Sequence, residues 1–529
     1  MSNNNYILPV ASAAYKPAKQ TFSVVCRGSW LSLAQAEIFK QKVALHFPLV
    51  NINIIIKQTE GDKNQSTPLH LVEGKDFFTK NIQAFLQTGQ ADFAIHSMKD
   101  VSGEDFFNQN YYAIIDREDI RDVAIFNNNI IEKIKHNQPI IIGTSSPRRT
   151  NMATNFLTKA LPQFNNVYPT IQAIPVRGNV DVRLQKLEAG NMYDGIILAA
   201  AGLNRLLQYA PAKQTVNNLL RNKKLMYLPL FDCPPATGQG AIVVETVANN
   251  ADAICILNKM KDTVNHNAIQ QERTMAAKYG YGCSQQFGTF HIDLPSVSFT
   301  YAAGNDVHAT PFTEWDCANM QKPFVGKIFA TSNYMKDFFT YQFNDEVNIP
   351  NEGNTVFIAS HKAIHSNKLV QQLANKNVWA AGTKSWLALA KQGVWVQGSA
   401  DGLGIEFIEQ TFKGLLLRID PSKVLIITNT ISAINWQQQN RLAIGTYTLQ
   451  PILSAALQNE IAAADNIFWT SFQQYQLCKP FLKTNLVHYC LPGRTATLLQ
   501  QQGIVPIIFP SIKACNLWMN QNTISINEG

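Results

Sequence analysis

The stretch Ala94-Ile95-His96-Ser97-Met98-Lys99-Asp100-Val101-Ser102 is the point where a short apolar run ends in a cluster of polar and ionisable side chains. Residues 91–95 predict a buried strand that leads into this cluster. In open α/β sheets, ligands bind beyond the carboxyl ends of such strands, so we expect His96, Lys99 and Asp100 at the mouth of a cleft. Taken alone, the pattern fits equally well a strand exit whose charges are only solvated.

Length and charge narrow the class of protein. The 529 residues are too many for one hydrophobic core, and they predict roughly three to five domains. The net charge of +8 is a mild excess without long Lys/Arg runs, which suits anionic small molecules at least as well as nucleic acid. No apolar run reaches about 18 residues, and the first residues lack the pattern of a signal peptide. We therefore expect neither a transmembrane helix nor export.

The eight cysteines are spread along the chain without a Cys-x-x-Cys pair or a cysteine/histidine cluster at metal-ligand spacing. Disulfides and structural zinc are therefore poorly supported, and we expect no metal site. Thiols that stay reduced in the cytoplasm fit this distribution better.

Arginines follow several predicted strands. Strand 21–26 leads into Arg27 and Ser29, and Ser29 is expected to cap a helix from Trp30 to about Phe47. Arg27 at this turn can bind an anion near the helix N-terminus, although a plain surface arginine fits as well.

A second strand, 139–142, ends in Gly143-Thr144-Ser145-Ser146-Pro147-Arg148-Arg149. Hydroxyls, a proline suited to the first helical turn and free backbone N–H groups favour a carboxylate or phosphate here. The strands at 173–176 and 195–199 lead in turn to Arg177 and Arg183 and to Arg205. The repetition of arginine at strand ends makes a surface role for each one less plausible.

Two polar segments are predicted to be a solvated crossover and a mobile loop. The alternating charges of residues 116–122 predict a solvated crossover, with most of these side chains in local ion pairs. Residues 63–77 are polar and contain Pro68 and Gly74, which predicts a mobile loop before a helix that resumes at Phe78.

Seven motifs, in one order over roughly residues 20–290, are together similar to those of the porphobilinogen deaminase (hydroxymethylbilane synthase) family. They are Arg27-x-Ser29-x-Leu31, Gly74-Lys75-x-x-Phe78-x-Lys80, His96-Ser97-Met98-Lys99-Asp100-Val101, Arg117-Glu118-Asp119-x-Arg121-Asp122, Gly143-Thr144-Ser145-Ser146-x-Arg148-Arg149, Arg177-Gly178-Asn179-Val180-x-x-Arg183 and Gly238-Gln239-Gly240.

The resemblance implies an α/β fold with two periplasmic-binding-protein-like domains and a small third α/β domain. The implied bounds are 20–115 with a return segment at about 226–248, 116–225, and 249–322. The low-regularity segment beyond about Asp293 is expected to finish the third domain and to link onward through Pro323.

The resemblance also implies a dipyrromethane cofactor, built from two substrate molecules and held by a thioether to Cys283 in the turn Tyr279-Gly280-Tyr281-Gly282-Cys283-Ser284. Tyr281 replaces the first glycine of the family's turn. The other seven cysteines are expected to be small core residues.

The reaction implied is the stepwise condensation of four porphobilinogen molecules to hydroxymethylbilane with loss of ammonia. Asp100 is expected to stabilise positive charge on pyrrole nitrogens. Lys99 is expected to hold carboxylates, because nothing in the sequence indicates the desolvation that a nucleophilic lysine needs. The remaining implied contacts are Ser97, Thr144, Ser145, Ser146, Arg148 and Arg149 for the cofactor, and Arg27, Ser29, His96, Arg177, Arg183 and Arg205 for the substrate carboxylates.

The loop before Phe78 has the family's position for a lid, to which Lys75 and Phe78 would belong. Asp76 and Asn81 depart from the family pattern there, and Phe78 fits a core position at a helix start equally well.

Residues 323–529 show a new α/β series, with strands at 327–330, 355–360, 377–382, 423–428, 466–471 and 486–490. Two segments repeat, 381–393 and 492–503, which predicts two Rossmann-like parallel α/β domains. The half resembles uroporphyrinogen-III synthase, although Thr331-Ser332 stands where that family has Thr-Arg and the opening unit is short.

That second resemblance makes Tyr447, Thr470, Ser471 and Thr495 candidates for binding the bilane, with capping or packing as the alternative for each. The whole half is alternatively an inactive scaffold. The sequence thus predicts a monomeric cytoplasmic bifunctional enzyme acting on porphobilinogen and hydroxymethylbilane, without nucleic-acid or membrane partners. A solute-binding protein is the rival, but it needs no covalent anchor such as Cys283 and is usually exported.

Overall fold

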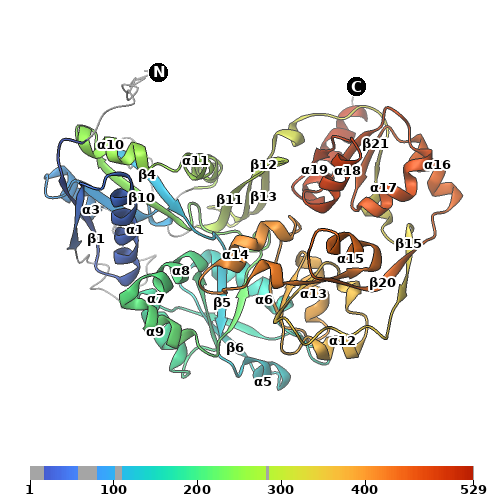
Figure 1. The fold of residues 1–529 in the computed structure, drawn as a ribbon, viewed down its shortest axis with the longest axis horizontal. Coiled ribbons are helices and arrows are strands. Elements are labelled where there is room, and N and C mark those ends of the chain that lie inside the picture. Colours follow the sequence, from blue (N-terminus) through green and yellow to red (C-terminus); the bar gives the residue numbers. More distant parts are fainter. Residues whose placement is uncertain (1–16, 58–79, 102–109, 281–284, 528–529) are drawn as a thin grey trace.

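The computed structural model describes residues 17–57, 80–101, 110–280 and 285–527. Over these residues the chain is a mixed α/β protein whose strands form five sheets, most of them containing parallel pairs (Figure 1). Within the same residues, no helix is long and apolar enough to cross a membrane. The lid candidates Lys75 and Phe78 and the anchor candidate Cys283 lie outside the described residues.

The first sheet has the order β2-β1-β3-β10-β4, with β1 parallel to β2 and β3, and β10 antiparallel to β3 and β4. Its strands and helices are β1 (Thr21–Arg27), β2 (Asn51–Lys57), β3 (Phe93–Ser97), β4 (Asn110–Arg117), β10 (Ala241–Val247), α1 (Trp30–His46), α3 (Lys80–Gln87) and α10 (Ala251–Met260). Alternate residues of β1 face opposite sides, as a strand requires. Val24 and Cys26 pack with α1 and α10, and Val25 packs with α3.

The second sheet has the order β7-β6-β8-β5-β9. Its strands and helices are β5 (Asp122–Phe126), β6 (Ile140–Gly143), β7 (Ile171–Ile174), β8 (Gly195–Ala199), β9 (Lys224–Tyr227), α5 (Ile130–Lys135), α6 (Thr154–Ala160), α7 (Val180–Glu188), α8 (Ala200–Gln208) and α9 (Ala210–Leu220). In this sheet β5 is antiparallel to both neighbours, as β10 is in the first sheet.

Two crossovers join these sheets. The first crossover, residues 118–121, runs from β4 to β5, and the return crossover, residues 228–240, runs from β9 to β10. They are hydrogen-bonded to each other, since Glu118 N donates to Gly240 O at 3.0 Å and Gln239 Nε2 donates to Ile120 O at 2.7 Å. The predicted solvated crossover is wrong for its last two residues, because Arg121 and Asp122 are 4% and 1% exposed.

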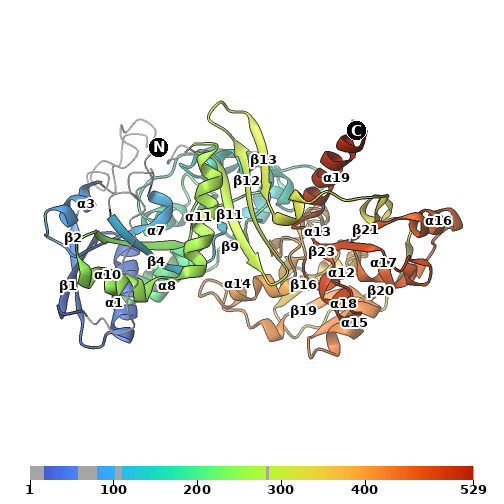
Figure 2. The same cartoon turned by 90° about the horizontal axis from the view of Figure 1, so that it is seen from above.

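The third sheet is antiparallel and consists of β11 (Gln286–Leu294), β12 (Val297–Asn305) and β13 (Pro311–Asp316) beside α11 (Thr263–Ala277). It stands upright between the halves of the molecule in Figure 2. The prediction of low regularity beyond Asp293 is therefore wrong. The residues Val297-Ser298-Phe299-Thr300-Tyr301 alternate apolar and polar, and this period-two pattern forms β12.

The second half contains two further sheets. One has the order β14-β21-β22-β23 and is wholly parallel; the other has the order β15-β20-β19-β16-β17-β18 and is parallel except for the β15–β20 pair. The strands are β14 (Ile328–Ala330), β15 (Phe339–Phe343), β16 (Thr355–Ile358), β17 (Asn377–Ala380), β18 (Val396–Ser399), β19 (Leu425–Asn429), β20 (Ala443–Pro451), β21 (Asn466–Trp469), β22 (Val487–Cys490) and β23 (Ile507–Ile508). The chain thus leaves the four-stranded sheet after β14 and returns to it at β21.

Helices of the second half cover these sheets. They are α12 (Asn367–Gln372), α13 (Thr383–Ala390), α14 (Glu409–Lys413), α15 (Thr430–Gln437), α16 (Ala455–Ala463), α17 (Phe472–Cys478), α18 (Arg494–Gln501) and α19 (Ile512–Asn527). The predicted strands at 355–360, 377–382, 423–428, 466–471 and 486–490 are confirmed within a few residues. The antiparallel pair β15–β20 was not predicted.

The two halves share one hydrophobic core, and α6 and α13 lie side by side in Figure 1. Trp386 packs edge-on against Phe156 with ring centroids 5.1 Å apart. Trp395 packs edge-on against Phe126 at 5.5 Å, and its indole N–H donates to Leu225 O at 3.1 Å. This junction resembles the inside of a domain more than a contact between mobile domains.

Candidate functional site

The stretch that follows β3 forms one tight turn, Met98–Asp100. Met98 is buried, while Lys99 and Asp100 are half-buried. The return crossover passes directly over Met98: a Cβ on Gly238, whose φ is +72°, would lie 2.7 Å from Met98 Cγ. A glycine is needed there for both the close approach and the positive φ. The turn therefore holds Lys99 and Asp100 at the strand end where the sequence predicted chemistry.

Positive and negative charges gather around this turn. Burial lowers the pKa of Lys99, which Asp100 raises again and Arg149 and Arg183 lower further. Burial also lowers the pKa of Arg183 to about 10, with Arg149 and Arg177 acting in the same direction. The structure thus brings together Lys99, Asp100 and the three predicted arginines. Burial of Lys99, which the sequence did not indicate, thus favours its neutral form, and its role in holding carboxylates stays a prediction.

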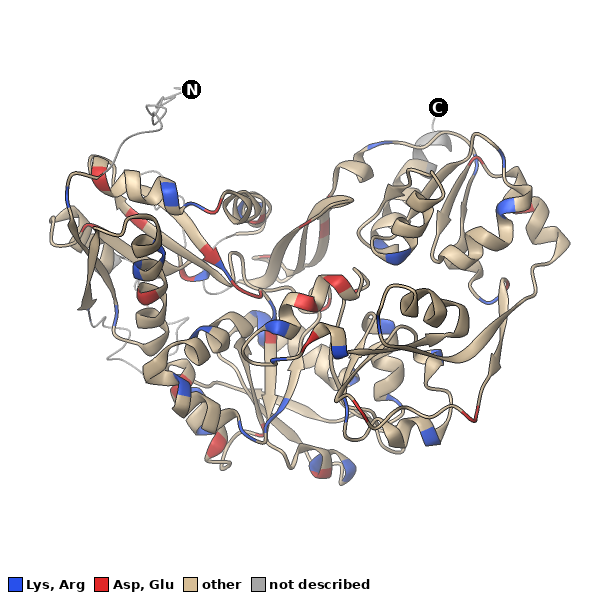
Figure 3. Ribbon diagram, viewed as in Figure 1, with Lys and Arg blue, Asp and Glu red and all other residues tan. Residues whose placement is uncertain are grey.

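Arg148 and Arg149 share one buried carboxylate. Asp122 Oδ2 accepts from Arg148 Nη2 at 2.8 Å, and the two oxygens of Asp122 accept from Arg149 Nε and Nη2 at 3.1 and 2.7 Å. Gln239 Nε2 donates to the same carboxylate at 2.9 Å. Burial opposes ionisation, but the arginines hold the pKa of Asp122 well below its usual value. Figure 3 shows acidic and basic residues side by side at this end of β5.

The predicted hydroxyls have partners within the protein. Ser145 Oγ donates to Val176 O at 2.7 Å, and Thr144 Oγ1 accepts from Ser146 N at 3.2 Å. Ser97 Oγ accepts from Gln35 Nε2 at 2.8 Å. Ser29 caps α1, as predicted, by accepting from Ser32 N at 3.2 Å. These bonds order the strand ends around the charged turn.

The bonds of His96 and Arg205 are made to residues outside the charged turn. The His96 Nε2 atom is 2.8 Å from Glu245 Oε1, with both side chains buried in the first sheet. Arg205 Nη2 donates to Asp116 Oδ2 at 2.8 Å and to Gly240 O at 2.6 Å. Their predicted contacts with substrate remain predictions, as does that of Arg27, which is half-buried at the end of β1.

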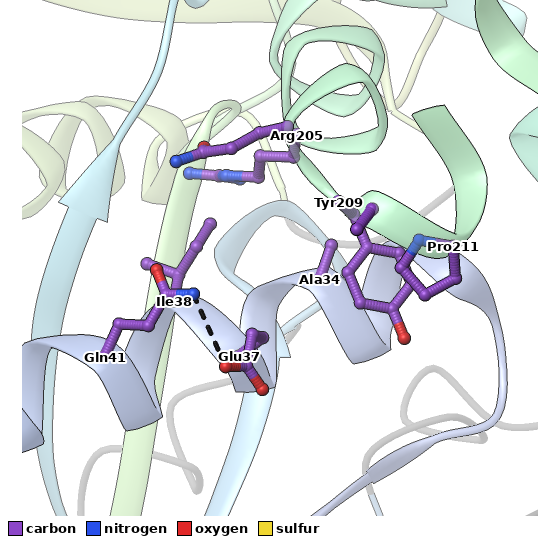
Figure 4. A pocket seen from close by; sticks show the side chains of 9 residues that line it. Ala34, Glu37, Ile38, Gln41, Arg205, Tyr209 and Pro211 are labelled. Atoms are coloured by element: carbon purple, nitrogen blue, oxygen red, sulfur yellow. Dashed lines mark hydrogen bonds between the residues drawn. The ribbon is translucent and has the colours of Figure 1, made fainter. Parts of the chain in front are cut away.

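Arg205 also lines a cavity of about 410 Å³ between α1 and the α8–α9 pair. Figure 4 shows Glu37, Gln41 and Tyr209 around it, with a hydrogen bond of 3.4 Å from Gln41 Nε2 to Glu37 Oε1. The cavity lies where the helices of the first and second sheets meet. A change in the angle between the two sheets therefore changes its size.

Two residues of α11 were missed by sequence reasoning. Arg273 Nη1 donates to Val101 O at 3.3 Å, directly after the charged turn. The buried Glu272 accepts from Arg117 Nη2 at 2.7 Å, from Gly238 N at 2.8 Å and from His291 N at 3.0 Å. One carboxylate thus ties β4, the return crossover and β11 together. An acidic residue within a helix carries no sequence signal for such a role.

In the second half, the candidates lie in or directly after strands of two different sheets or on a helix that follows one of them. Tyr447 is buried in β20, and burial raises its pKa. Ser471 caps α17 in a capping box with Gln474, and Thr470 Oγ1 donates to Gln474 Oε1 at 2.8 Å. Thr495 is half-buried in the first turn of α18. The observed bonds of Thr470 and Ser471 belong to capping and packing.

Comparisons with known proteins give the following similarities. Residues 22–254 match the family model described as porphobilinogen deaminase, dipyrromethane cofactor binding domain. The chain is 32% identical over 275 residues to the porphobilinogen deaminase of Burkholderia orbicola, covering 52% of this chain and 75% of that protein. It is 34% identical over 265 residues to the porphobilinogen deaminase of Coxiella burnetii, covering 50% of this chain and 78% of that protein.

Among solved structures, uroporphyrinogen-III synthetase from Helicobacter pylori is similar at 17% identity and a TM-score of 0.24. The match covers 35% of this chain and 90% of that one.

Proposed function

The chain belongs to the porphobilinogen deaminase family, and on that premise we propose which of its residues carry out the reaction. The first half is a porphobilinogen deaminase with the dipyrromethane-cofactor-binding domain of the family. It condenses four porphobilinogen molecules into hydroxymethylbilane and releases ammonia. The cluster of Lys99, Asp100, Arg149, Arg177 and Arg183 is the observation that supports these residues as its site.

The donor set suits the cofactor, because a dipyrromethane carries several carboxylates and the cluster carries several cations. When bound, the cofactor supplies the pyrrole carbon onto which the product grows. Lys99, Arg148 and Arg149, with the hydroxyls of Ser97, Thr144, Ser145 and Ser146, would hold its carboxylates or order the loops that do so. Arg148 and Arg149 are already bound to Asp122, so we assign them the shaping of the site together with a share in carboxylate binding.

Substrate carboxylates would be bound by the half-buried Arg177 and Arg183, of which Arg183 interacts with Asp100 and with Arg177. Ser29 and Arg27 at the start of α1 would add further contacts, while His96 and Arg205 support the sheet and the crossovers. Asp100 faces the pyrrole nitrogen, where positive charge develops as ammonia leaves porphobilinogen. A fixed carboxylate stabilises that charge without having to reorient.

We assign the domains as predicted, with the cofactor anchored at Cys283. The matching strand arrangement of the first and second sheets supports two periplasmic-binding-protein-like domains, and α11 with the third sheet supports the third domain. The lid role of Lys75 and Phe78 stays a prediction. A monomeric cytoplasmic protein is part of the same proposal.

Intact-mass spectrometry tests the anchor. We expect the purified protein to carry an adduct of two pyrrole units that Cys283→Ser abolishes. Cys255→Ser is the matched control, because Cys255 is half-buried on α10 and has no assigned role. Absence of the adduct, or its persistence in Cys283→Ser, would refute the assignment.

For the second half, we propose cyclisation of hydroxymethylbilane to uroporphyrinogen III between its two sheets. Tyr447 lies in β20 of the six-stranded sheet, and Thr495 lies in α18, which follows β22 of the four-stranded sheet. A hydrogen bond of 2.9 Å from Gln473 Nε2 of α17 to Ser432 Oγ of α15 joins helices that follow strands of the two sheets. The alternative is an inactive scaffold, which the shared core with the first half would favour.

Isomer analysis of the product made from porphobilinogen distinguishes the cyclase hypothesis from the inactive-scaffold hypothesis. Uroporphyrinogen III as the main product supports the cyclase, and only the spontaneously formed isomer I supports the scaffold. Thr495→Val should lower the share of isomer III, whereas Thr497→Val, an exposed position on the same helix, should not.

A further inference from the structure

The crossovers between the first two sheets are held from outside by the second half of the chain. Asp401 follows β18, and its side chain is 1% exposed. Its Oδ2 accepts from Arg121 Nη2 in the first crossover at 3.1 Å. Its Oδ1 accepts from Leu230 N in the return crossover at 3.0 Å. The carboxylate of Asp401 therefore binds both crossovers between the two sheets that enclose the proposed deaminase site.

Thr411, in the same half, also binds the first crossover. Thr411 on α14 donates from Oγ1 to Asp119 Oδ2 at 2.5 Å and accepts from Arg121 Nη1 at 3.1 Å. Phe407 lies under the Arg121 guanidinium, with the ring centroid 5.1 Å from Cζ. Asn204 extends the network: its Oδ1 accepts from Leu416 N, and its Nδ2 donates to Glu118 Oε2 in the first crossover.

The hydrogen bonds of Asp401 and Thr411 lie next to the charged site in the sequence. Arg121 is followed by Asp122, the carboxylate shared by Arg148 and Arg149. A shift of the Arg121 backbone therefore moves the Asp122 carboxylate and the arginines bound to it. Arg149 is one of the charges that act on Lys99 and Arg183.

We infer that Asp401 is a positioning residue for the deaminase reaction: it fixes the two crossovers, and thereby sets the angle between the first and second sheets and the place of Asp122. This inference rests on the proposed deaminase function. It assigns to the second half a role in the first reaction that is separate from any cyclisation. The aspartate touches no substrate and acts through Arg121 and Leu230.

The conformation of Asp401 fits this role. Its φ of +54° lies in the left-handed region, which aspartate tolerates better than most residues, and Gly402 follows with φ +78°. The turn thereby directs the carboxylate back toward the crossovers. Asp401→Asn keeps the shape and this conformational tolerance but leaves one acceptor oxygen where two are needed. Its amide nitrogen would meet either the Arg121 guanidinium or the Leu230 N–H, both of which are donors.

The full-length wild type and Asp401→Asn are compared in porphobilinogen consumption, thermal unfolding and the cofactor adduct by intact mass. We expect kcat to fall by about tenfold, within the range for residues that act on a site through contacts. KM, the unfolding midpoint and the adduct should stay close to wild type, because Arg121 keeps its pairing with Asp119. Asp337→Asn, an exposed aspartate of the same half, is the matched control and should leave all four unchanged.

A well-folded Asp401→Asn protein with normal kcat would refute the inference, and a fall in kcat only in proportion to lost folded protein would reduce Asp401 to a structural residue. If Asp401→Asn fails to fold, Thr411→Val decides the matter in the same assays, since it removes one hydroxyl of the network at nearly constant volume. Normal turnover in that variant would overturn the inference. A wild type that consumes no porphobilinogen would instead refute the deaminase function itself.

Discussion

Trp386, in the second half of the chain, donates its indole N–H to the backbone carbonyl of Ala160, in the first half, at 3.1 Å. Both residues are fully buried. The bond satisfies a carbonyl of the last turn of α6 with a side chain that lies 226 residues further along. The first half therefore depends on the second for part of its own interior.

Trp386→Ala should destabilise the first half as well as the second. Removal of a buried tryptophan costs about 3–5 kcal/mol, and here it also leaves the Ala160 carbonyl without its donor. Hydrogen-exchange mass spectrometry should show lost protection in α6. Trp518→Ala is the control, because Trp518 is 1% exposed but donates to Lys322 O at 2.7 Å and packs in a cluster that includes no residue of α6. Unchanged exchange in α6 of the Trp386 variant would contradict a shared core.

Asp100→Asn should leave folding and the cofactor adduct intact while turnover falls by orders of magnitude. A charge pair about 4 Å apart at an effective dielectric near 20 is worth roughly 4 kcal/mol. Because about 1.4 kcal/mol is a factor of ten, the loss can approach a thousandfold. Single-turnover measurement of porphobilinogen consumption checks this. The turnover of Asp100→Glu, which keeps the charge but displaces it, should lie between that of the wild type and that of Asp100→Asn. Near-normal turnover of Asp100→Asn would refute the role of Asp100 in stabilising charge.

Asp122→Asn should lower the free energy of unfolding at pH 7 by about 3–5 kcal/mol, because it leaves two buried arginines without their carboxylate. Since the folded-state pKa of Asp122 is held below its unfolded value, its stabilisation is present above about pH 4 and is lost as the pH falls through the folded value. The difference between variant and wild type should therefore shrink toward low pH in urea titrations. Glu132→Gln, at an exposed pair with Lys135, should show no such change.

The pH profile of kcat should have an acidic limb near pH 6 that Asp401→Asn lacks. Burial raises the pKa of Asp401 to about 6, with Arg121 acting in the opposite direction. The charged groups that act on it are Arg121 and Asp232, and Arg121 is also paired with Asp119. Below that pH the carboxyl group is neutral and its ion pair with Arg121 is lost, so turnover should fall.

The same raised pKa predicts the effect of pH on stability. A raised folded-state value favours the protonated form, so the contribution of Asp401 to stability is fully present below about pH 4 and is lost as the pH rises through about 6. Turnover and stability should therefore change in opposite directions between these values. Parallel changes in both would indicate plain unfolding instead.

The strands that position the site could be predicted from the sequence, because β6 and β8 are apolar runs and β1 is rich in β-branched and aromatic residues, and each leads into glycine, hydroxyl or arginine residues. Residues Lys99 and Asp100 could be placed at a strand end for the same reason. The burial of Asp122 could not, since its partners Arg149 and Gln239 lie 27 and 117 residues away. Local charge alternation is the same for a solvated crossover and for a buried one.

The contacts of Asp401 and Trp386 could not be predicted from the sequence either. Both depend on how two halves with separate family resemblances pack together, and neither resemblance describes that packing. The antiparallel pair β15–β20 was missed because Phe339–Phe343 is short and is paired only with a strand a hundred residues later. Its pairing partner, rather than its own composition, makes it a strand.

The return of the chain to earlier sheets has a consequence for biosynthesis. Strand β10 completes the first sheet only after the second has been made, and β21 gives β14 its neighbour only after the six-stranded sheet. On the ribosome, β14 must therefore wait unpaired while more than a hundred further residues are translated, and domains emerge and fold in order of synthesis. We expect nascent chains that have exposed β20 but not β21 to be cleaved near β14 by limited proteolysis, and completed chains to resist it.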